Sequence, residues 1–134
     1  MRECVVLRAF HYAQAQTAYR SGHTGPEYFD CTGLVYRVFA DGAATHVIGA
    51  QGGQPVLGYY EWFSARGQAD ALPPQKGDLV VHGPQYAHIA IYVGEGRAIS
   101  TLLDGVRVHD AARLHSIEPD ERMPVEAYLH IRPD

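Results

Sequence analysis

Residues 88–102, HIAIYVGEGRAISTL, decide the fold. Two apolar runs rich in β-branched residues flank the sequence GEG at 94–96, which is typical of a tight hairpin turn. A second turn candidate, DG at 104–105, leads into another apolar run. We therefore expect antiparallel strands over 88–94 and 97–103, with a third strand following the second turn.

The sequence changes its period on either side of this hairpin. GDLVVHG at 77–83 and AYLHI at 127–131 have the composition or the alternation of strands. The first half of the chain instead repeats apolar residues at helical spacing. Helices followed by an antiparallel meander predict an α+β protein.

Three helices are expected in that first half. One runs from Glu3 to about Tyr19, with apolar or small residues recurring at Val6, Phe10, Ala13 and Thr17. The second begins after Asp30, which is a good N-cap, and ends at DG, 41–42. Its apolar stripe consists of Leu34, Val35, Val38 and Phe39. Residues 49–58 are expected to form a loop, and 59–65 a short aromatic helix whose Tyr59, Tyr60, Trp62 and Phe63 are more typical of core than of a groove.

Composition excludes several classes of protein. The chain has 134 residues, of which 46% are hydrophobic and 19% are charged, so we expect one compact domain over 1–134. A net charge of −4 without a basic cluster argues against a nucleic acid partner. No run approaches the roughly eighteen apolar residues of a membrane span, and the opening MRECVVLRAF does not resemble a signal peptide. We therefore expect a soluble domain.

Cys31 is the candidate nucleophile. The Asp30 cap places it in the first turn of a helix, where free amides and the helix dipole lower a thiol pKa. The same amides can donate to an oxyanion, and Gly33 leaves room for a close approach one turn into the helix. The alternative is a buried structural cysteine, because free cysteines are often buried.

His88 is the candidate general base. It opens an apolar strand, so a rigid sheet would hold it, whereas the other seven histidines are interpreted as bystanders. The hairpin register puts His88 nearly opposite Leu102, with Ser100 as a diagonal neighbour on the same face. Ser100 is thus expected to orient the imidazole. The alternative for His88 is a solvated histidine at a strand end.

Metal chemistry has little support in the sequence. No two histidines have the i, i+4 spacing of a helical zinc site, and there is no C-x-x-C motif. We expect neither a metal nor an organic cofactor. The two cysteines, Cys4 and Cys31, leave a single disulfide open by counting alone.

Three segments resemble the NlpC/P60 family of papain-like cysteine peptidases, over roughly residues 5–108. FDCTGLVYRVFADGA at 29–43 is similar to the family's F-D-C-S-G-L-V helix start. PQKGDLVVHG at 74–83 resembles its G-D-L-V-F strand, and HIAIYVGEGRAIS at 88–100 resembles H-V-G-I-Y-x-G-x-G-x-x-I-H. The resemblance implies a papain-like fold with N-terminal helices packed on an antiparallel sheet, Cys31 as nucleophile and His88 as base.

The chain departs from the family pattern at its third catalytic position. Ser100 stands where the family usually carries His, Asn or Gln, and Thr32 replaces the common serine after the cysteine. Asp30 is retained, and Tyr19 matches the tyrosine of the family's P-Y-x-x-G-G segment. The resemblance implies that Tyr19, Asp30 and Thr32 bind the free amine of a stem peptide.

The resemblance also implies the reaction, which is hydrolysis of peptidoglycan stem peptides at γ-D-glutamyl to diamino acid bonds. Two alternatives remain open. Ser100 is compatible with a binding module that has lost turnover, and the Cys31–His88 pair is compatible with an amidase or acyltransferase that acts on another small acyl substrate.

Overall fold

The computed structural model describes residues 1–20, 22–23, 25, 27–49, 54–102, 104–111, 113–115 and 122–132. The helices are α1 (Arg2–Gln14), α2 (Cys31–Ala40), the short 3-10 helix η1 (Thr45–Val47) and α3 (Val56–Ala65). The strands are β1 (Ala18–Tyr19), β2 (Tyr28–Phe29), β3 (Ala69–Asp70), β4 (Leu79–His82), β5 (His88–Gly94), β6 (Arg97–Leu102), β7 (Gly105–Asp110), β8 (Arg113–His115) and β9 (Arg122–Leu129).

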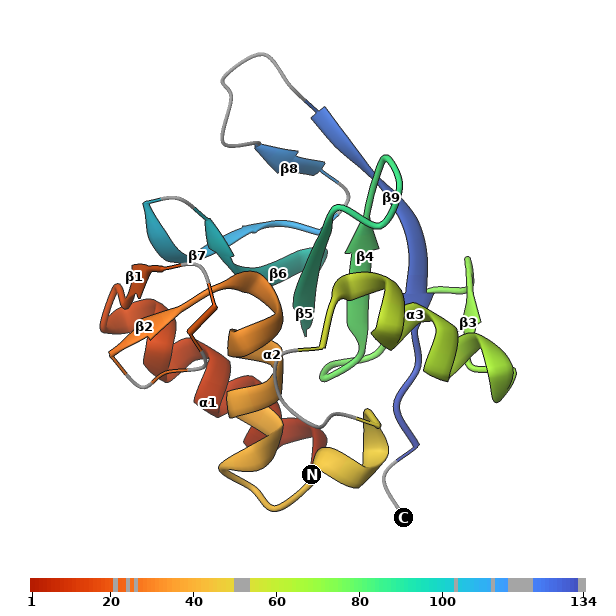
Figure 1. Ribbon diagram of the computed structural model, residues 1–134, viewed down its shortest axis with the longest axis horizontal. Helices are drawn as coiled ribbons and strands as arrows, with labels where there is room; N and C mark the ends of the chain where they lie inside the picture. Colours follow the sequence, from red (N-terminus) through yellow and green to blue (C-terminus); the bar gives the residue numbers. More distant parts are fainter. Residues whose placement is uncertain are drawn as a thin grey trace.

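The predicted α+β architecture is confirmed. The main sheet is antiparallel, with the strand order β3-β9-β4-β5-β6-β7, and β8 pairs with β9. Strands β4 to β7 form the expected meander, whereas β9 returns to lie between β3 and β4. Helices α1 and α2 pack against β5, β6 and β7, and α3 packs against β3 and β9 (Figure 1). Strands β1 and β2 form a separate parallel pair.

The hairpin at the centre of the sheet has the expected register. Ile91 pairs with Ile99 and Tyr92 with Ala98, and the chain turns at residues 95–96. The register shifts between Tyr92 and Gly94. Leu103, the last residue of the predicted second strand, lies outside the described residues. Because residues 88 and 100 then share one face of the sheet, the predicted relation between His88 and Ser100 is preserved.

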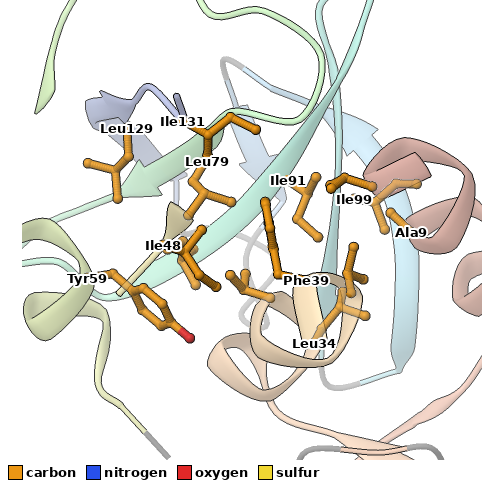
Figure 2. Packing of buried hydrophobic residues seen from close by; sticks show 14 of the residues in the cluster. Ala9, Leu34, Phe39, Ile48, Tyr59, Leu79, Ile91, Ile99, Leu129 and Ile131 are labelled. Atoms are coloured by element: carbon orange, nitrogen blue, oxygen red, sulfur yellow. The ribbon is translucent and has the colours of Figure 1, made fainter. Parts of the chain in front are cut away.

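The two faces of the sheet carry separate hydrophobic clusters. Large apolar residues on one face pack against the helices to form the main core (Figure 2). They include Leu79, Ile91, Ile99 and Leu129 from the sheet and Ala9, Leu34, Phe39, Ile48 and Tyr59 from the helical side. A smaller cluster consists of Val80, Ala90, Ala98 and Ala111. Strand alternation puts His88 on the same face of β5 as Ala90, among these small residues.

The first helix is shorter than predicted. It ends at Gln14 instead of Tyr19, because the chain turns at Gln16 (φ 52°) and residues 18–19 pair with β2 as β1. Its buried face is also rotated from the predicted stripe and consists of Val5, Val6, Ala9 and Tyr12.

Other boundaries differ by a few residues. Helix α2 agrees with its prediction, but α3 begins at Val56, inside the predicted loop, of which residues 50–53 lie outside the described residues. Strand β9 covers Arg122–Leu129 instead of 127–131, and the short strands β1, β2, β3 and β8 were not predicted. Two or three residues are too few to show a period. Within the described part of the chain, every helix is too short or too polar to cross a membrane.

Candidate active site

The start of α2 is fixed by Asp30, as the sequence predicts. Asp30 has extended backbone (ψ −177°), and its Oδ1 accepts a hydrogen bond from the Gly33 N–H (2.6 Å). Its Oδ2 accepts another from the Gly22 N–H (3.0 Å). Capping therefore makes Cys31 the first residue of the helix.

Gly33 is required by a close approach of backbone. A Cβ at this position would collide with the carbonyl oxygen of His23 and with Asp30 Oδ1. The same His23 carbonyl accepts a hydrogen bond from the Asp30 N–H (3.0 Å). The expected close approach at Gly33 is thus made by the loop before α2, which it ties to the N-terminus of the helix.

The pKa of the Cys31 thiol differs from the expectation. Burial raises the pKa above the ordinary thiol value, and the negative charge of Asp30 adds to the increase. Hydrogen bonds from the backbone N–H groups of Ile89, Thr32 and Cys31 itself act in the opposite direction. The helix start does favour the thiolate, but loss of water around the sulfur outweighs it. The prediction of a depressed pKa is therefore wrong for the free protein.

His88 is the residue before Ile89, whose backbone N–H contacts the Cys31 sulfur. His88 is only 6% exposed, and burial, followed by repulsion from His82 and His109, lowers its pKa to about 3. Its Nε2 has no hydrogen-bond partner among the described residues. At neutral pH the site holds a neutral thiol and a neutral imidazole.

Two of the histidines that were interpreted as bystanders, His82 and His109, lie close to His88 and form one polar cluster with it. His82 on β4 is the cross-strand partner of His88, and their ring centroids lie 6.1 Å apart. The His109 ring on β7 lies 6.1 Å from that of His82. Strands β4 and β7 are separated by two others in the sheet, so this short distance requires a strongly curved sheet. The pairing of β4 with β5 accounts for the position of His82 beside His88. The approach of His109 to His82 depends on the curvature of the sheet, which the sequence does not reveal.

Ser100 makes a different contact from the one expected. Its side chain is fully buried, and its Oγ lies 2.6 Å from Nε2 of His109. His109 pairs with Ala98 across β6 and β7, two residues from Ser100. Ser100 thus joins the cluster of His82, His88 and His109 through its hydrogen bond to His109 on the neighbouring strand β7.

The three candidate binding residues surround the first turn of α2. Thr32 Oγ1 donates to Asp30 Oδ1 (3.3 Å). Tyr19 is 37% exposed and pairs with Phe29, the residue before Asp30. The parallel pairing of β1 with β2 therefore brings Tyr19 close to the segment that leads into α2, although Tyr19 and Asp30 are eleven residues apart in sequence.

Tyr59 is a buried polar neighbour that the sequence did not single out as part of the site. Its side chain is fully buried in α3, and its hydroxyl, which points toward α2 (Figure 2), has no partner among the described residues. Burial raises its pKa, and the nearby Asp30 and Cys31 raise it further. Tyr59 and Phe63 are core residues, as predicted, while Tyr60 and Trp62 are half-buried.

Both cysteines are free, so the disulfide left open by counting is not formed. Cys4 is exposed and Cys31 is partly buried. Across the described residues, no group of three or more His, Cys, Asp or Glu side chains is arranged to hold a metal ion. The Cys31 thiol and the His88 imidazole can support nucleophilic and acid–base chemistry.

Comparisons with known proteins agree with this architecture. The NlpC/P60 family matches residues 16–119. The "Probable endopeptidase p60" of Listeria seeligeri is 34% identical over 94 residues, and that of Listeria welshimeri is 36% identical over 94 residues. Each alignment covers 67% of this chain but 16% of the relative, so the chain spans about a sixth of those proteins.

Solved structures show the same fold. The NlpC/p60 domain of the peptidoglycan hydrolase SagA has a TM-score of 0.66 at 22% identity, covering 96% of this chain and 97% of that one. An NlpC/P60 family protein from Bacillus cereus has a TM-score of 0.67 at 17% identity, covering 99% of this chain and 41% of that one. Because the family match covers most of the chain, this protein belongs to the NlpC/P60 family.

Proposed function

We propose that this domain is a cysteine peptidase that hydrolyses amide bonds in the stem peptides of bacterial cell walls. One observation carries the proposal: backbone amides from the first turn of α2 and from Ile89 contact the Cys31 sulfur, and Ile89 directly follows the buried His88 at the start of β5. Family membership supports it, as do relatives named endopeptidase and peptidoglycan hydrolase.

The reaction begins from the neutral pair. His88 takes the thiol proton as the Cys31 sulfur attacks the carbonyl carbon, which gives a tetrahedral intermediate with a negative oxygen. A thiol of raised pKa favours proton transfer during attack over a preformed ion pair. The intermediate expels the amine, which takes the proton from His88. Water then cleaves the thioester, releasing the acid and restoring the thiol.

The N–H groups around the sulfur supply electrostatic stabilisation. Those of Cys31, Thr32 and Ile89 are fixed by α2 and β5, so they need no rearrangement when charge develops. Their proximity to the thiol supports a role at the developing thiolate and oxyanion.

Substrate recognition is assigned to Tyr19, Asp30 and Thr32. The Asp30 carboxylate at the mouth of α2 provides the negative charge that complements a free amine of the stem peptide. Tyr19, exposed on β1, supplies a wall for that end of the substrate. In this proposal the cleaved bond joins γ-D-glutamate to the diamino acid.

A binding module that does not turn over is the second candidate. The raised pKa of Cys31 and the very low pKa of His88 favour it, because neither group is charged at rest. Both functions predict stem-peptide binding, but only the peptidase predicts cleavage.

Mass spectrometry of purified wall fragments tests the proposal. We expect incubation with the protein to release a new amine at the γ-D-glutamyl bond and the Cys31→Ala variant to release none. An added amine acceptor separates hydrolysis from acyl transfer. Fragments that bind without changing mass would contradict the peptidase and favour the binding module.

A further inference from the structure

The protonation of His109 follows from its contacts. His109 Nδ1 lies 2.9 Å from the carbonyl oxygen of Asp110, which can only accept a hydrogen bond. Nδ1 therefore carries the proton of the neutral ring, and Nε2 is left as an acceptor. The Ser100 hydroxyl, 2.6 Å from that Nε2, must then donate to it.

This donation leaves the Ser100 oxygen with free lone pairs. Ser100 is fully buried and shares its face of the sheet with His88. His88 Nε2 is a buried nitrogen without a partner among the described residues, and such a group destabilises the fold unless it finds one. The Ser100 oxygen, on the same face of the sheet, is an acceptor for this Nε2–H.

We propose that His109 is a positioning residue for His88 and acts through Ser100. Resting on the peptidase function proposed above, this assignment divides the third catalytic position between two strands. Ser100 of β6 supplies the oxygen for His88, and His109 of β7 fixes the direction of the Ser100 hydroxyl. The chain of contacts is His88 Nε2–H to Ser100 Oγ–H to His109 Nε2.

The relay moves no proton along its length. When His88 takes the Cys31 proton, it becomes an imidazolium in a buried site, where an uncompensated charge is costly. The Ser100 oxygen, whose own proton is held by His109, accepts from that imidazolium and stabilises it. After the amine leaves with the proton, His88 and Ser100 return to their starting states.

His109 also connects the cluster to the surface. It lines a cavity of about 390 Å³ together with Glu95, Gly96, Arg97, Val108 and Asp110. None of these residues belongs to α2, so the cavity is separate from the helix start that carries Cys31. A small molecule that enters it can reach the place of the His109 ring.

Variants of both relay residues test the proposal in the full chain. The parent carries Cys4→Ser, because Cys4 is exposed and would react with thiol reagents. His109→Leu removes the acceptor, His109→Gln keeps one, and Ser100→Ala breaks the link to His88. His46→Gln, an exposed histidine in η1, is the matched control.

We expect His109→Leu to lower kcat about tenfold with KM within twofold, and His109→Gln to recover most of the loss. In Ser100→Ala, adding His109→Leu should cause no further loss, because residues that act through one contact are not additive. A wild-type kcat in His109→Leu, or effects of Ser100→Ala and His109→Leu that multiply, would overturn the relay.

Cys31 alkylation by iodoacetamide gives a readout that does not depend on turnover. We expect His109→Leu to slow alkylation at pH 7 but not at high pH, where hydroxide replaces His88 as the base. Equal slowing at every pH would indicate a structural defect and contradict the proposal. If alkylation of Cys31 in the parent depends on His88 but the parent leaves wall fragments intact, the proposed peptidase function is contradicted. The alkylation rates of the variants still test the relay.

Imidazole rescue covers the case in which His109→Leu does not fold. In His109→Ala, added imidazole can enter the cavity and replace the missing ring. We expect it to restore alkylation at pH 7 in His109→Ala and to have no effect in Ser100→Ala/His109→Ala. Rescue of both variants, or of neither, would contradict the relay.

Discussion

Two histidines in this protein, the half-buried His130 and the buried His88, have opposite surroundings. His130 at the end of β9 has both ring nitrogens bonded to carboxylates, with Nδ1 3.0 Å from Asp78 Oδ2 and Nε2 2.6 Å from Asp70 Oδ1. The fully buried Asp78 is held in turn by Arg2, whose Nη1 lies 2.8 Å from Asp78 Oδ1. His88 Nε2 has no hydrogen-bond partner in the part of the chain that the structure describes, and the His82 and His109 imidazoles repel the charged form of its ring.

The pKa values follow the surroundings. Burial alone would lower the pKa of His130, but its hydrogen bonds to Asp70 and Asp78 raise it overall. Burial, followed by repulsion from His82 and His109, lowers the pKa of His88 to about 3. The hydrogen-bonded network of His130, Asp78 and Arg2 ties residues near both chain termini to the sheet. The His88 imidazole, which stays neutral, is instead available to accept a proton during the reaction. Each prediction below tests this division between structure and catalysis.

Replacing Cys31 by alanine should have the largest effect on activity. Without the sulfur no thioester forms, and we expect turnover of wall fragments to fall about 10,000-fold or below detection. Thermal unfolding should change little, since the side chain is small and partly buried. Substantial remaining hydrolysis would reject the mechanism.

His88→Ala should cost nearly as much turnover as Cys31→Ala, since nucleophile and base act as one unit. The double variant should be no slower than either single variant. Steady-state kinetics on the same fragments measure both comparisons. Losses that multiply would show that the two residues work independently.

Asp78→Ala should have the largest effect on stability. It leaves the backbone N–H groups of Gln75 and Ile131 without their acceptor and Arg2 and His130 without their partner. We expect unfolding in urea to show a loss of about 3 kcal/mol, with kcat per folded molecule unchanged. Asp104→Ala, which removes an exposed pair with Arg107, is the matched control and should cost less than about 1 kcal/mol. An equal cost in both variants would remove the distinction drawn above.

Ser100→Ala should have a smaller effect on activity than either Cys31→Ala or His88→Ala. One hydrogen bond to a charged imidazole is worth about 1.5–3 kcal/mol, so we expect kcat to fall roughly 10- to 100-fold. Stopped assays with the His46→Gln variant alongside give the comparison. A loss as large as that of Cys31→Ala would make the hydroxyl indispensable.

The smallest predicted effect is on the pH dependence of stability. The pKa of His130 is raised above its ordinary 6.5 in the folded state, so the protonated ring stabilises the fold below that value. This stabilisation is lost as pH rises through the raised pKa. The Tm difference between wild type and His130→Gln should therefore be larger at pH 5.5 than at pH 9. A difference that grows with pH would reverse the sign and refute the assignment.

The sequence predicts the parts of this molecule that depend on local pattern. The Asp30 cap, the apolar stripe of α2 and the turn at residues 94–96 are each specified within a few residues, and all three agree with the structure. The end of α1 was missed because the pairing of β1 with β2, a contact between separate segments, overrides a helical pattern.

The site was predictable only in part for the same reason. Cys31 and His88 stand out through their places at a helix start and a strand start. The partnership of Ser100 with His109 depends on the register of β6 with β7, and the approach of His82 to His109 depends on sheet curvature. Burial around the sulfur, which reverses the expected pKa shift of Cys31, is likewise a property of the packed fold.

Trapping the acyl-enzyme tests the central claim most directly. Acid quenching during turnover of a defined stem peptide, followed by mass mapping, reports which residue carries the acyl group. The account predicts that the peptide containing Cys31 gains the mass of the acyl half of the substrate and that the one containing Cys4 does not. Steady hydrolysis with unmodified Cys31, undiminished in Cys31→Ala, would contradict it.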